Sequence, residues 1–187
     1  MADTPDIPPG ARDVSIPIEE IMRHALVPAL ALFVGPLVVY ALIWGVGPLL
    51  DVLVTVEALL LTLAGFVALI IAHEVVHAVG WMIAGRLPPR SIRFGIDLKT
   101  LSPYARAMIP LRASAYRIGA ALPLLVTGIA PWLLALFTGD ARLAMIAALL
   151  ISGAVGDLYV LWAIREVPGQ ARVLDHPSSA GCYVLPD

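Results

Sequence analysis

Four long apolar runs constrain the fold of this 187-residue chain more than any other feature of its sequence. They cover about residues 26–50, 57–84, 118–137 and 141–164. Each run is near or above the roughly 20 residues that a helix needs to cross a bilayer. The chain is 60% hydrophobic with a mean hydropathy of +0.90, whereas soluble domains are about 45–50% apolar. We therefore predict an all-α membrane protein with about four transmembrane helices.

The length predicts a single integral membrane domain over residues 1–187. We expect a cytoplasmic N-terminal segment over 1–25, a four-helix core over 26–164 and a cytoplasmic tail over 165–187. Within the core, residues 85–117 form a cytoplasmic loop between the second and third helices. Breaks between the runs have local causes. Pro48 and Asp51 close the first run, "GRLPP" closes the second, and "TGD" makes a tight turn between the third and fourth.

Basic residues fix the expected orientation, because cytoplasmic loops of membrane proteins carry an excess of Lys and Arg. The loop between the second and third runs holds Arg86, Arg90, Arg93, Lys99, Arg106, Arg112 and Arg117. The opposite side has only Arg142, beside Asp51, Glu57 and Asp140. Both termini and the long loop should therefore face the cytoplasm, where the loop meets anionic lipid. The single lysine among 12 basic residues is typical of a prokaryotic source, so we expect a prokaryotic plasma membrane.

Two segments of this loop alternate apolar with polar residues, as strands do. They are "SIRFGID" and "YARAMIP", and the turn-like "LKTLSP" lies between them. This pattern predicts a short β-hairpin near the cytoplasmic surface of the membrane.

The second apolar run contains the motif His73-Glu74-Val75-Val76-His77. Residues four apart share one face of a helix, so His73 and His77 can bind one metal ion. Glu74 lies about 100° around the helix, where its carboxylate can reach a water activated by that metal. Two histidine ligands and a glutamate general base are the arrangement of a zinc hydrolase.

The apolar context makes this motif more informative than it is in a soluble protein. A charged side chain at the centre of a spanning helix costs roughly 2.5–3.5 kcal/mol on insertion scales, and a function or a pairing must offset that cost. Two alternatives remain open from the sequence. The three side chains can simply hydrogen-bond to neighbouring helices, or they can bind a metal without catalysis.

A catalytic zinc usually has three protein ligands and a water, and Asp157 is the best candidate for the third ligand. It is the one ionisable residue well inside another span. His73 lies as far along its span from Glu57 as Asp157 lies from Ala141, so both should sit at similar depth. The alternative is that Asp157 is a polar helix-end residue near the membrane interface.

Small residues beside Asp157 predict how its helix packs. Ser152, Gly153 and Gly156 offer a small-residue surface, which lets helix backbones approach closely in membranes. Ala72, Gly80 and Ala84 offer a comparable surface on the second span. We therefore expect the second and fourth spans to close on each other around the metal.

Taken together, the motif and the later aspartate resemble the site-2 protease group of intramembrane zinc metalloproteases. More closely, the chain resembles the compact family named "putative zincin peptidase". The segments "FGID", "LSPYA", "AYRIGAALP", "TGIAP" and "DHPSSAGCYV" also fit that family. The resemblance covers about residues 23–184.

This resemblance implies one zinc ion below the membrane surface, with His73, His77 and Asp157 as ligands and Glu74 as the catalytic glutamate. Site-2 proteases commonly place the aspartate before a glycine, in an "LDG"-like motif. Here the order is Gly156-Asp157-Leu158, which departs from those proteases but suits the compact family.

The function expected from these features is zinc-dependent intramembrane or juxtamembrane peptide hydrolysis, with a membrane protein or peptide as substrate. An extended substrate segment can pair with the edge of the predicted hairpin. Nothing points to a nucleic-acid partner, and an oligomer is compatible with the sequence. The main alternative is a non-catalytic membrane zinc-binding or scaffold protein that retains the fold. A transporter fits less well, because no continuous polar path crosses the spans.

Five further polar residues have plainer interpretations. Tyr104 and Tyr116 are interfacial anchors more readily than helpers at the site. His24 is interpreted as an interfacial residue. His176 and Cys182 are plain tail residues more readily than groups that bind metal or occlude the site. We also expect "GCYVLP" to form a short strand against the loop hairpin.

Overall fold

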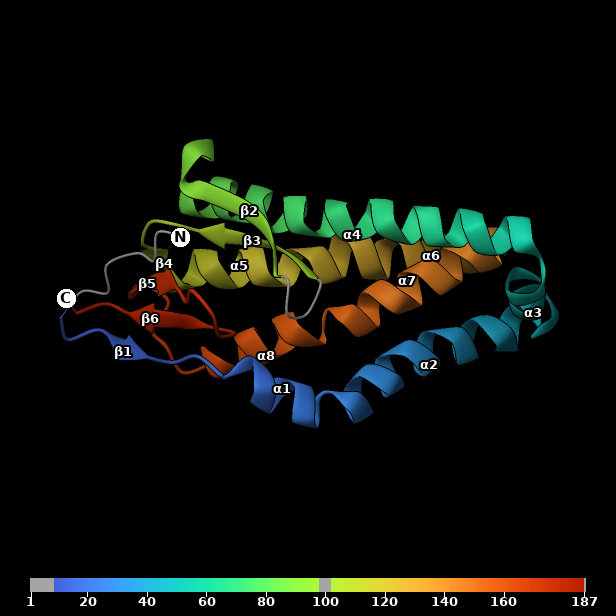
Figure 1. Cartoon of the computed structure of the whole chain (residues 1–187), viewed down its shortest axis with the longest axis horizontal. Helices are drawn as coiled ribbons and strands as arrows, with labels where there is room; N and C mark the ends of the chain where they lie inside the picture. Colours follow the sequence, from blue (N-terminus) through green and yellow to red (C-terminus); the bar gives the residue numbers. More distant parts are fainter. Residues whose placement is uncertain (1–8, 98–101, 187) are drawn as a thin grey trace. The chain divides into compact units, whose positions relative to one another are not determined.

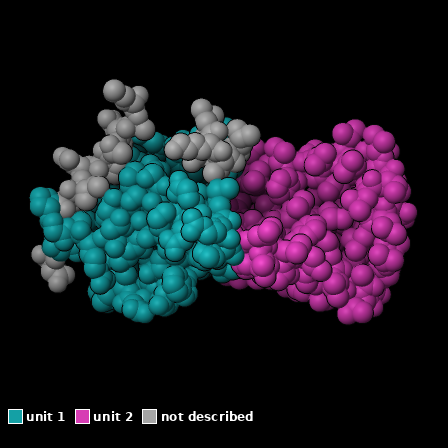
Figure 2. Space-filling model, turned by 60° about the horizontal axis from the view of Figure 1, so that its bottom comes forward, with its two compact units in different colours: residues 1–24, 74–122, 156–187 teal, residues 25–73, 123–155 magenta. Residues whose placement is uncertain are grey.

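A computed structural model describes residues 9–97 and 102–186 of the chain. It divides into two compact units, which we describe separately (Figure 2). Unit 1 comprises residues 1–24, 74–122 and 156–187, and unit 2 comprises residues 25–73 and 123–155. The sequence predicts a single membrane domain, and this stays a prediction, because a division into compact units does not test it.

Within the described residues, four helical segments are long and apolar enough to cross a membrane. They are α2 (Leu26–Trp44), α4 (Val56–Gly85), Ala113–Thr138 and Ala141–Ala163 (Figure 1). The third segment comprises α5 (Ala113–Pro123), the π-helix η2 (Leu124–Ile129) and α6 (Ala130–Thr138), and the fourth comprises α7 (Ala141–Gly153) and α8 (Val155–Ala163). This result confirms the mostly helical chain with four apolar spans. Their orientation in a membrane stays a prediction.

In unit 2, the first span ends earlier than the sequence indicated. We placed its end near residue 50, but α2 ends at Trp44 because Gly45 takes a positive φ of 82°. A separate helix, α3 (Gly47–Val54), follows, with Pro48 in its first turn. Proline is favoured there because it has no N–H to leave unpaired. Pro48 therefore begins a helix and does not close one.

Buried side chains of α2, α3, α6 and α7 form the core of unit 2. Tyr40 is completely buried there, and its hydroxyl donates to the carbonyl of Gly139 over 2.5 Å. Gly139 has a φ of 73°, and the side chain of Asp140 caps α7 by accepting from the backbone N–H groups of Arg142 and Leu143. The tight turn predicted between the third and fourth spans is therefore present.

Unit 1 contains two small antiparallel sheets. In the first, β2 (Ile92–Asp97) pairs with β3 (Ser102–Ala107), and Phe94 lies opposite Ala105. The predicted strands are thus present and paired. Residues 98–101 of the predicted turn lie outside the described residues, and the cytoplasmic placement of the pair stays a prediction. The second sheet has the order β1-β6-β5-β4. Its strands are β1 (Arg12–Asp13), β4 (Leu111–Arg112), β5 (Arg172–Asp175) and β6 (Cys182–Val184).

The tail strand pairs differently from our expectation. "GCYVLP" does contain a strand, β6, but its partners are β5 and β1 and not the β2–β3 pair. Both edges of β6 are occupied, because Cys182 pairs with Asp175 on one side and accepts from the Val14 N–H on the other. The N-terminal strand, the C-terminal tail and the end of the loop therefore share one sheet.

Helices α4 and α5 approach each other closely in unit 1. A Cβ added to Gly80 would lie 2.8 Å from the Cα of Gly119, and one added to Gly119 would overlap the ring of Trp81, so both positions require glycine. The predicted close approach at Gly153 and Gly156 is wrong, since a Cβ at either position would meet no described atom within 4 Å. Small residues do bring helix backbones together here, but they do so on α4 and α5.

Candidate metal centre

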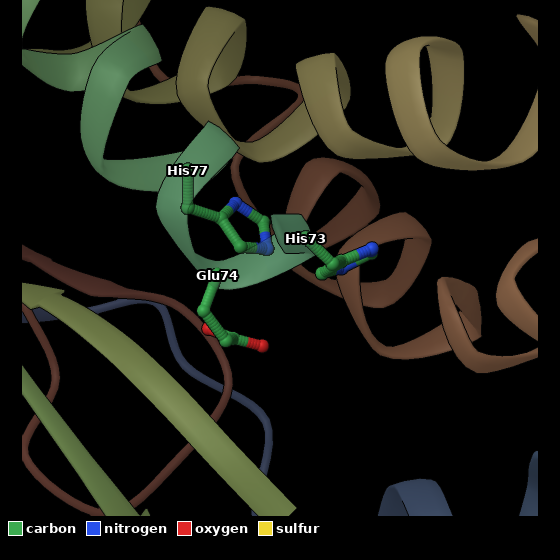
Figure 3. Close-up of side chains that lie close together, drawn as sticks. All are labelled: His73, Glu74 and His77. Carbon is green, nitrogen blue, oxygen red and sulfur yellow. The ribbon is translucent and has the colours of Figure 1, made fainter. Parts of the chain in front are cut away.

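The motif of the second span lies within the single continuous helix α4. Ligand atoms of His73, Glu74 and His77 all lie within 4.8 Å of one another (Figure 3). Both histidines are buried, with 8% and 7% of their surface exposed. Helix geometry alone brings these three groups together, as the four-residue spacing predicted.

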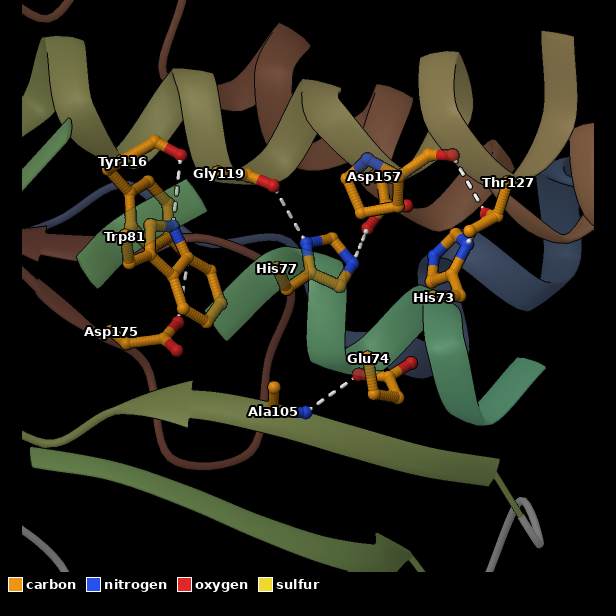
Figure 4. Close-up of polar contacts among 11 residues, drawn as sticks. His73, Glu74, His77, Trp81, Ala105, Tyr116, Gly119, Thr127, Asp157 and Asp175 are labelled. Atoms are coloured by element: carbon orange, nitrogen blue, oxygen red, sulfur yellow. Dashed lines mark hydrogen bonds and ion pairs between the residues drawn. The ribbon is translucent and has the colours of Figure 1, made fainter. Parts of the chain in front are cut away.

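The ring of His77 is oriented by the backbone of α5. Its Nδ1 lies 2.9 Å from the carbonyl oxygen of Gly119 (Figure 4). A carbonyl oxygen can only accept a hydrogen bond, so Nδ1 carries the proton. The close approach at Gly80 and Gly119 brings this carbonyl within reach. His77 therefore directs its Nε2 toward Asp157.

His73 is oriented in the same way by a side chain of η2. Its Nδ1 lies 3.2 Å from the hydroxyl oxygen of Thr127, and that hydroxyl donates to the carbonyl of Pro123 over 2.8 Å. Because the hydroxyl proton is already committed, Thr127 accepts from His73 Nδ1–H. Metal-binding histidines almost always donate their other ring N–H in this way. In both histidines of α4, Nδ1 makes the orienting contact, and Nε2 is the nitrogen that could bind a metal.

Asp157, on α8, lies against His77. Its Oδ1 is 3.2 Å from His77 Nε2 (Figure 4). A proton on Nε2 makes this contact an ion pair, and a metal cation between the two atoms would hold them at a similar separation. In a tetrahedral zinc site, neighbouring N and O ligands lie about 3.3 Å apart. The His77–Asp157 pair therefore fits zinc in donor type and in distance, and the group whose ligand atoms lie close together is His73, Glu74 and His77.

Glu74 points to strand β3. Its Oε2 accepts the backbone N–H of Ala105 over 2.7 Å (Figure 4). This contact holds the carboxylate beside the two histidines on the outer edge of the strand. The sequence predicted both a glutamate at this position and a nearby strand, but not that the two would be joined.

A chain of aromatic and polar contacts extends from His77 to the tail. Trp81 stacks on His77 and on Tyr116, with centroid distances of 5.5 and 5.8 Å. The Tyr116 hydroxyl donates to Asp175 Oδ1 over 2.7 Å, and Asp175 Oδ2 accepts the N–H of Ala107 over 3.3 Å. Strand β3 therefore presents two N–H groups on one edge to two carboxylates, one on α4 and one in the tail. Tyr116 is part of this support, so the sequence-based choice of an interfacial anchor missed its role.

The remaining candidates lie in the terminal segments. His176 Nδ1 accepts the backbone N–H groups of Ser178 and Ser179, and its Nε2 lies 2.8 Å from the hydroxyl of Tyr183. Cys182 is completely buried, and burial raises the pKa of its thiol to about 12. These contacts agree with their interpretation as tail residues. Burial also raises the pKa of Asp175, to about 6, against the opposing effects of Tyr116 and Arg106.

Sequence reasoning missed the groups that orient the ligands. Thr127 left a signal, because it is a hydroxyl in an otherwise apolar run. Gly119 and Ala105 act through backbone groups that every residue carries, so their side chains gave no signal. Asp175 lies in the tail, and no recognisable motif around it indicated a role at the site.

A model of the family described as "Putative zincin peptidase" matches residues 66–172, which is more than half of the chain. The matched region contains the histidine–glutamate group of α4 and Asp157. No curated protein and no solved structure matches the chain. The family supports a zinc metallopeptidase, and the group on α4 supplies residues that can bind a metal. By this match, the chain belongs to the putative zincin peptidase family.

Proposed function

We propose that this protein is a zinc-dependent peptidase that cleaves membrane-associated substrates within or beside the bilayer. His73, His77 and Asp157 would hold the zinc ion, and Glu74 would be the general base. The main support is the His77–Asp157 contact of 3.2 Å, which brings a carboxylate to the Nε2 of a motif histidine. The Nδ1 contacts of both histidines add to it, because they direct each Nε2 toward a metal.

A zinc ion held by these residues would supply a water whose pKa is lowered to about 7. Glu74 accepts the proton of that water as its oxygen attacks the peptide carbonyl. The carbon–nitrogen bond then breaks, and Glu74 returns the proton to the leaving amine. The backbone N–H of Ala105 keeps the Glu74 carboxylate in place, because this N–H donates to Glu74 Oε2.

The substrate would bind as an extended segment. A peptide bond in a helix is protected by its own hydrogen bonds, so a transmembrane substrate must unwind before cleavage. The outer edge of β3 runs past Glu74, and its Ala105 and Ala107 N–H groups bond the carboxylates of Glu74 and Asp175. A substrate strand added along this edge would pair with the carbonyl groups of the edge, which would bring the substrate backbone to the general base.

The apolar composition of α4 supports the proposal that cleavage takes place within or beside the bilayer. The motif lies in a helix of 30 residues with a hydropathy of 2.3 over its most apolar window. A likeness to site-2 proteases follows from this placement, and the substrate would then be a membrane protein or peptide.

Cleavage of a tagged transmembrane substrate by the detergent-purified protein tests the proposal. The same cleavable sequence in a soluble peptide serves as the matched substrate. We expect cleavage to stop after zinc is chelated and to return when zinc is restored. Cleavage that persists without zinc would contradict the proposal, and equal rates on both substrates would contradict its membrane specificity.

One observation favours a second candidate, a membrane zinc-binding protein without catalysis. The Glu74 carboxylate already has a structural partner in the Ala105 N–H. If Glu74 only joins α4 to β3, zinc would bind at full stoichiometry and no substrate would be cleaved.

A further inference from the structure

A basic pocket lies where α4 ends and α5 begins, within unit 1. It has a volume of about 420 Å³ and is lined by Ala84, Gly85, Arg86 and Arg112. Ligand pockets usually have volumes of about 300–1,000 Å³. Two arginines among the lining residues of a pocket of this size indicate an anionic ligand, because arginine matches the geometry of phosphate and carboxylate oxygens.

The backbone of Arg86 is strained. It follows the last residue of α4 and takes a φ of 54°, and it is the only non-glycine residue with a positive φ in the described part of the chain. Glycine is usual at this position after a helix, because a Cβ is disfavoured in the left-handed region. A strained residue that persists without a structural need points to a function for its side chain. Arg86 is one of the four residues that line the pocket.

Arg112 has a like-charged neighbour. It lies directly opposite Arg172 in the β4–β5 ladder, and like charges in that position destabilise a sheet. Among the described residues, none of the ion pairs involves Arg86, Arg112 or Arg172. The pocket therefore concentrates positive charge that forms no ion pair with a carboxylate in the described part of the chain.

The position of the pocket identifies the source of the anion. Arg86 follows the end of one candidate span at Gly85, and Arg112 precedes the start of the next at Ala113. The ends of spanning helices lie at the level of the lipid headgroups. Basic pockets between such helix ends can hold the phosphates of anionic lipids.

We propose that Arg86 and Arg112 form a binding site for the phosphate headgroup of an anionic phospholipid. This site is separate from the residues of the candidate metal centre and does not depend on the proposed peptidase activity. Bound lipid would neutralise the two guanidinium groups and stabilise the junction between α4 and α5.

Native mass spectrometry of the full chain in a zwitterionic detergent tests this site. The probes are phosphatidylglycerol and phosphatidylcholine with the same acyl chains. We expect at least a fivefold preference for phosphatidylglycerol, and a loss of about fivefold in its affinity in each of Arg86→Gly and Arg112→Gln. Arg93→Gln is the matched control, because it removes an exposed arginine of the same unit that does not line the pocket.

Arg86→Gly also separates binding from folding. Glycine removes the strain, so this variant should unfold at the same or a higher temperature in the absence of lipid while it binds phosphatidylglycerol more weakly. A lower unfolding temperature would overturn the strain argument. Equal affinity for the two lipids, or equal losses in Arg93→Gln and the pocket variants, would overturn the site. Displacement of the lipid by millimolar inorganic phosphate would identify a site for free anions and overturn the lipid assignment.

Discussion

His77 Nε2 lies 3.2 Å from Asp157 Oδ1, and the two residues come from different helices, α4 and α8. The Gly119 carbonyl accepts the Nδ1 proton of His77, so Nε2 is the ring nitrogen that meets Asp157. A proton or a metal cation between these two atoms stabilises the pair. The family match makes zinc the cation to test first.

Replacing Asp157 tests its role as a ligand. We expect Asp157→Ala to weaken zinc binding by more than about 100-fold, because loss of a ligand should cost more than loss of an outer-shell contact. The measurement is a competition titration with a zinc indicator on the detergent-purified protein. Asp51→Ala, at an exposed position on α3, is the control and should leave zinc affinity unchanged. Unaltered stoichiometry and affinity in Asp157→Ala would remove Asp157 from the site.

Thr127→Val tests the hydrogen bond that orients His73. Valine keeps the shape of threonine but removes the acceptor for Nδ1–H, so we expect zinc affinity to fall about 10–100-fold. Thr62→Val is the matched control. Thr62 is also buried, and its hydroxyl bonds the carbonyl four residues earlier, as that of Thr127 does. Equal zinc affinities in the two variants would show that Thr127 does not orient a ligand.

Asp175 should make stability depend on pH. Burial raises its folded-state pKa to about 6 from an ordinary value of 3.8, so the folded protein holds this proton more tightly than the unfolded chain. The resulting stabilisation, about 3 kcal/mol, is complete below pH 4 and is lost as the pH rises through 6. Thermal unfolding between pH 4 and 7 measures it. Asp175→Asn should flatten this part of the curve, and an unchanged slope in that variant would contradict the prediction.

Cys182 should be inert in the folded protein. It is completely buried, and burial raises the pKa of its thiol to about 12, so almost no thiolate forms at neutral pH. We expect no labelling by a maleimide before unfolding and complete labelling after it, as read by mass spectrometry. Ser178→Cys adds an exposed thiol and should label at once. Rapid labelling of Cys182 in the folded wild type would show that the tail sheet opens.

The local features of the site could be predicted from the sequence, because helix periodicity determines them. The four-residue spacing of His73 and His77 placed their side chains together on α4. Asp157 was found by its depth, since an ionisable residue in an apolar span is rare and needs a partner. The β2–β3 pair followed from alternation of apolar and polar residues.

Long-range pairings could not be predicted in this way. The contact between Glu74 and β3 uses the N–H of Ala105, and an alanine side chain carries no information about it. The strand β6 was expected from its composition, but its partners depend on which sheet edges remain open after folding. The close approach at Gly119 looked no different in sequence from the glycines beside Asp157.

Glu74→Gln provides the most direct test of the proposed peptidase. Glutamine keeps the size of the side chain and its acceptor oxygen for Ala105 N–H, but it cannot take a proton from water. We predict that the purified variant binds one zinc per chain with wild-type affinity and cleaves the transmembrane substrate at least about 100-fold more slowly. Full zinc content with cleavage at the wild-type rate would contradict the role of Glu74 as the general base.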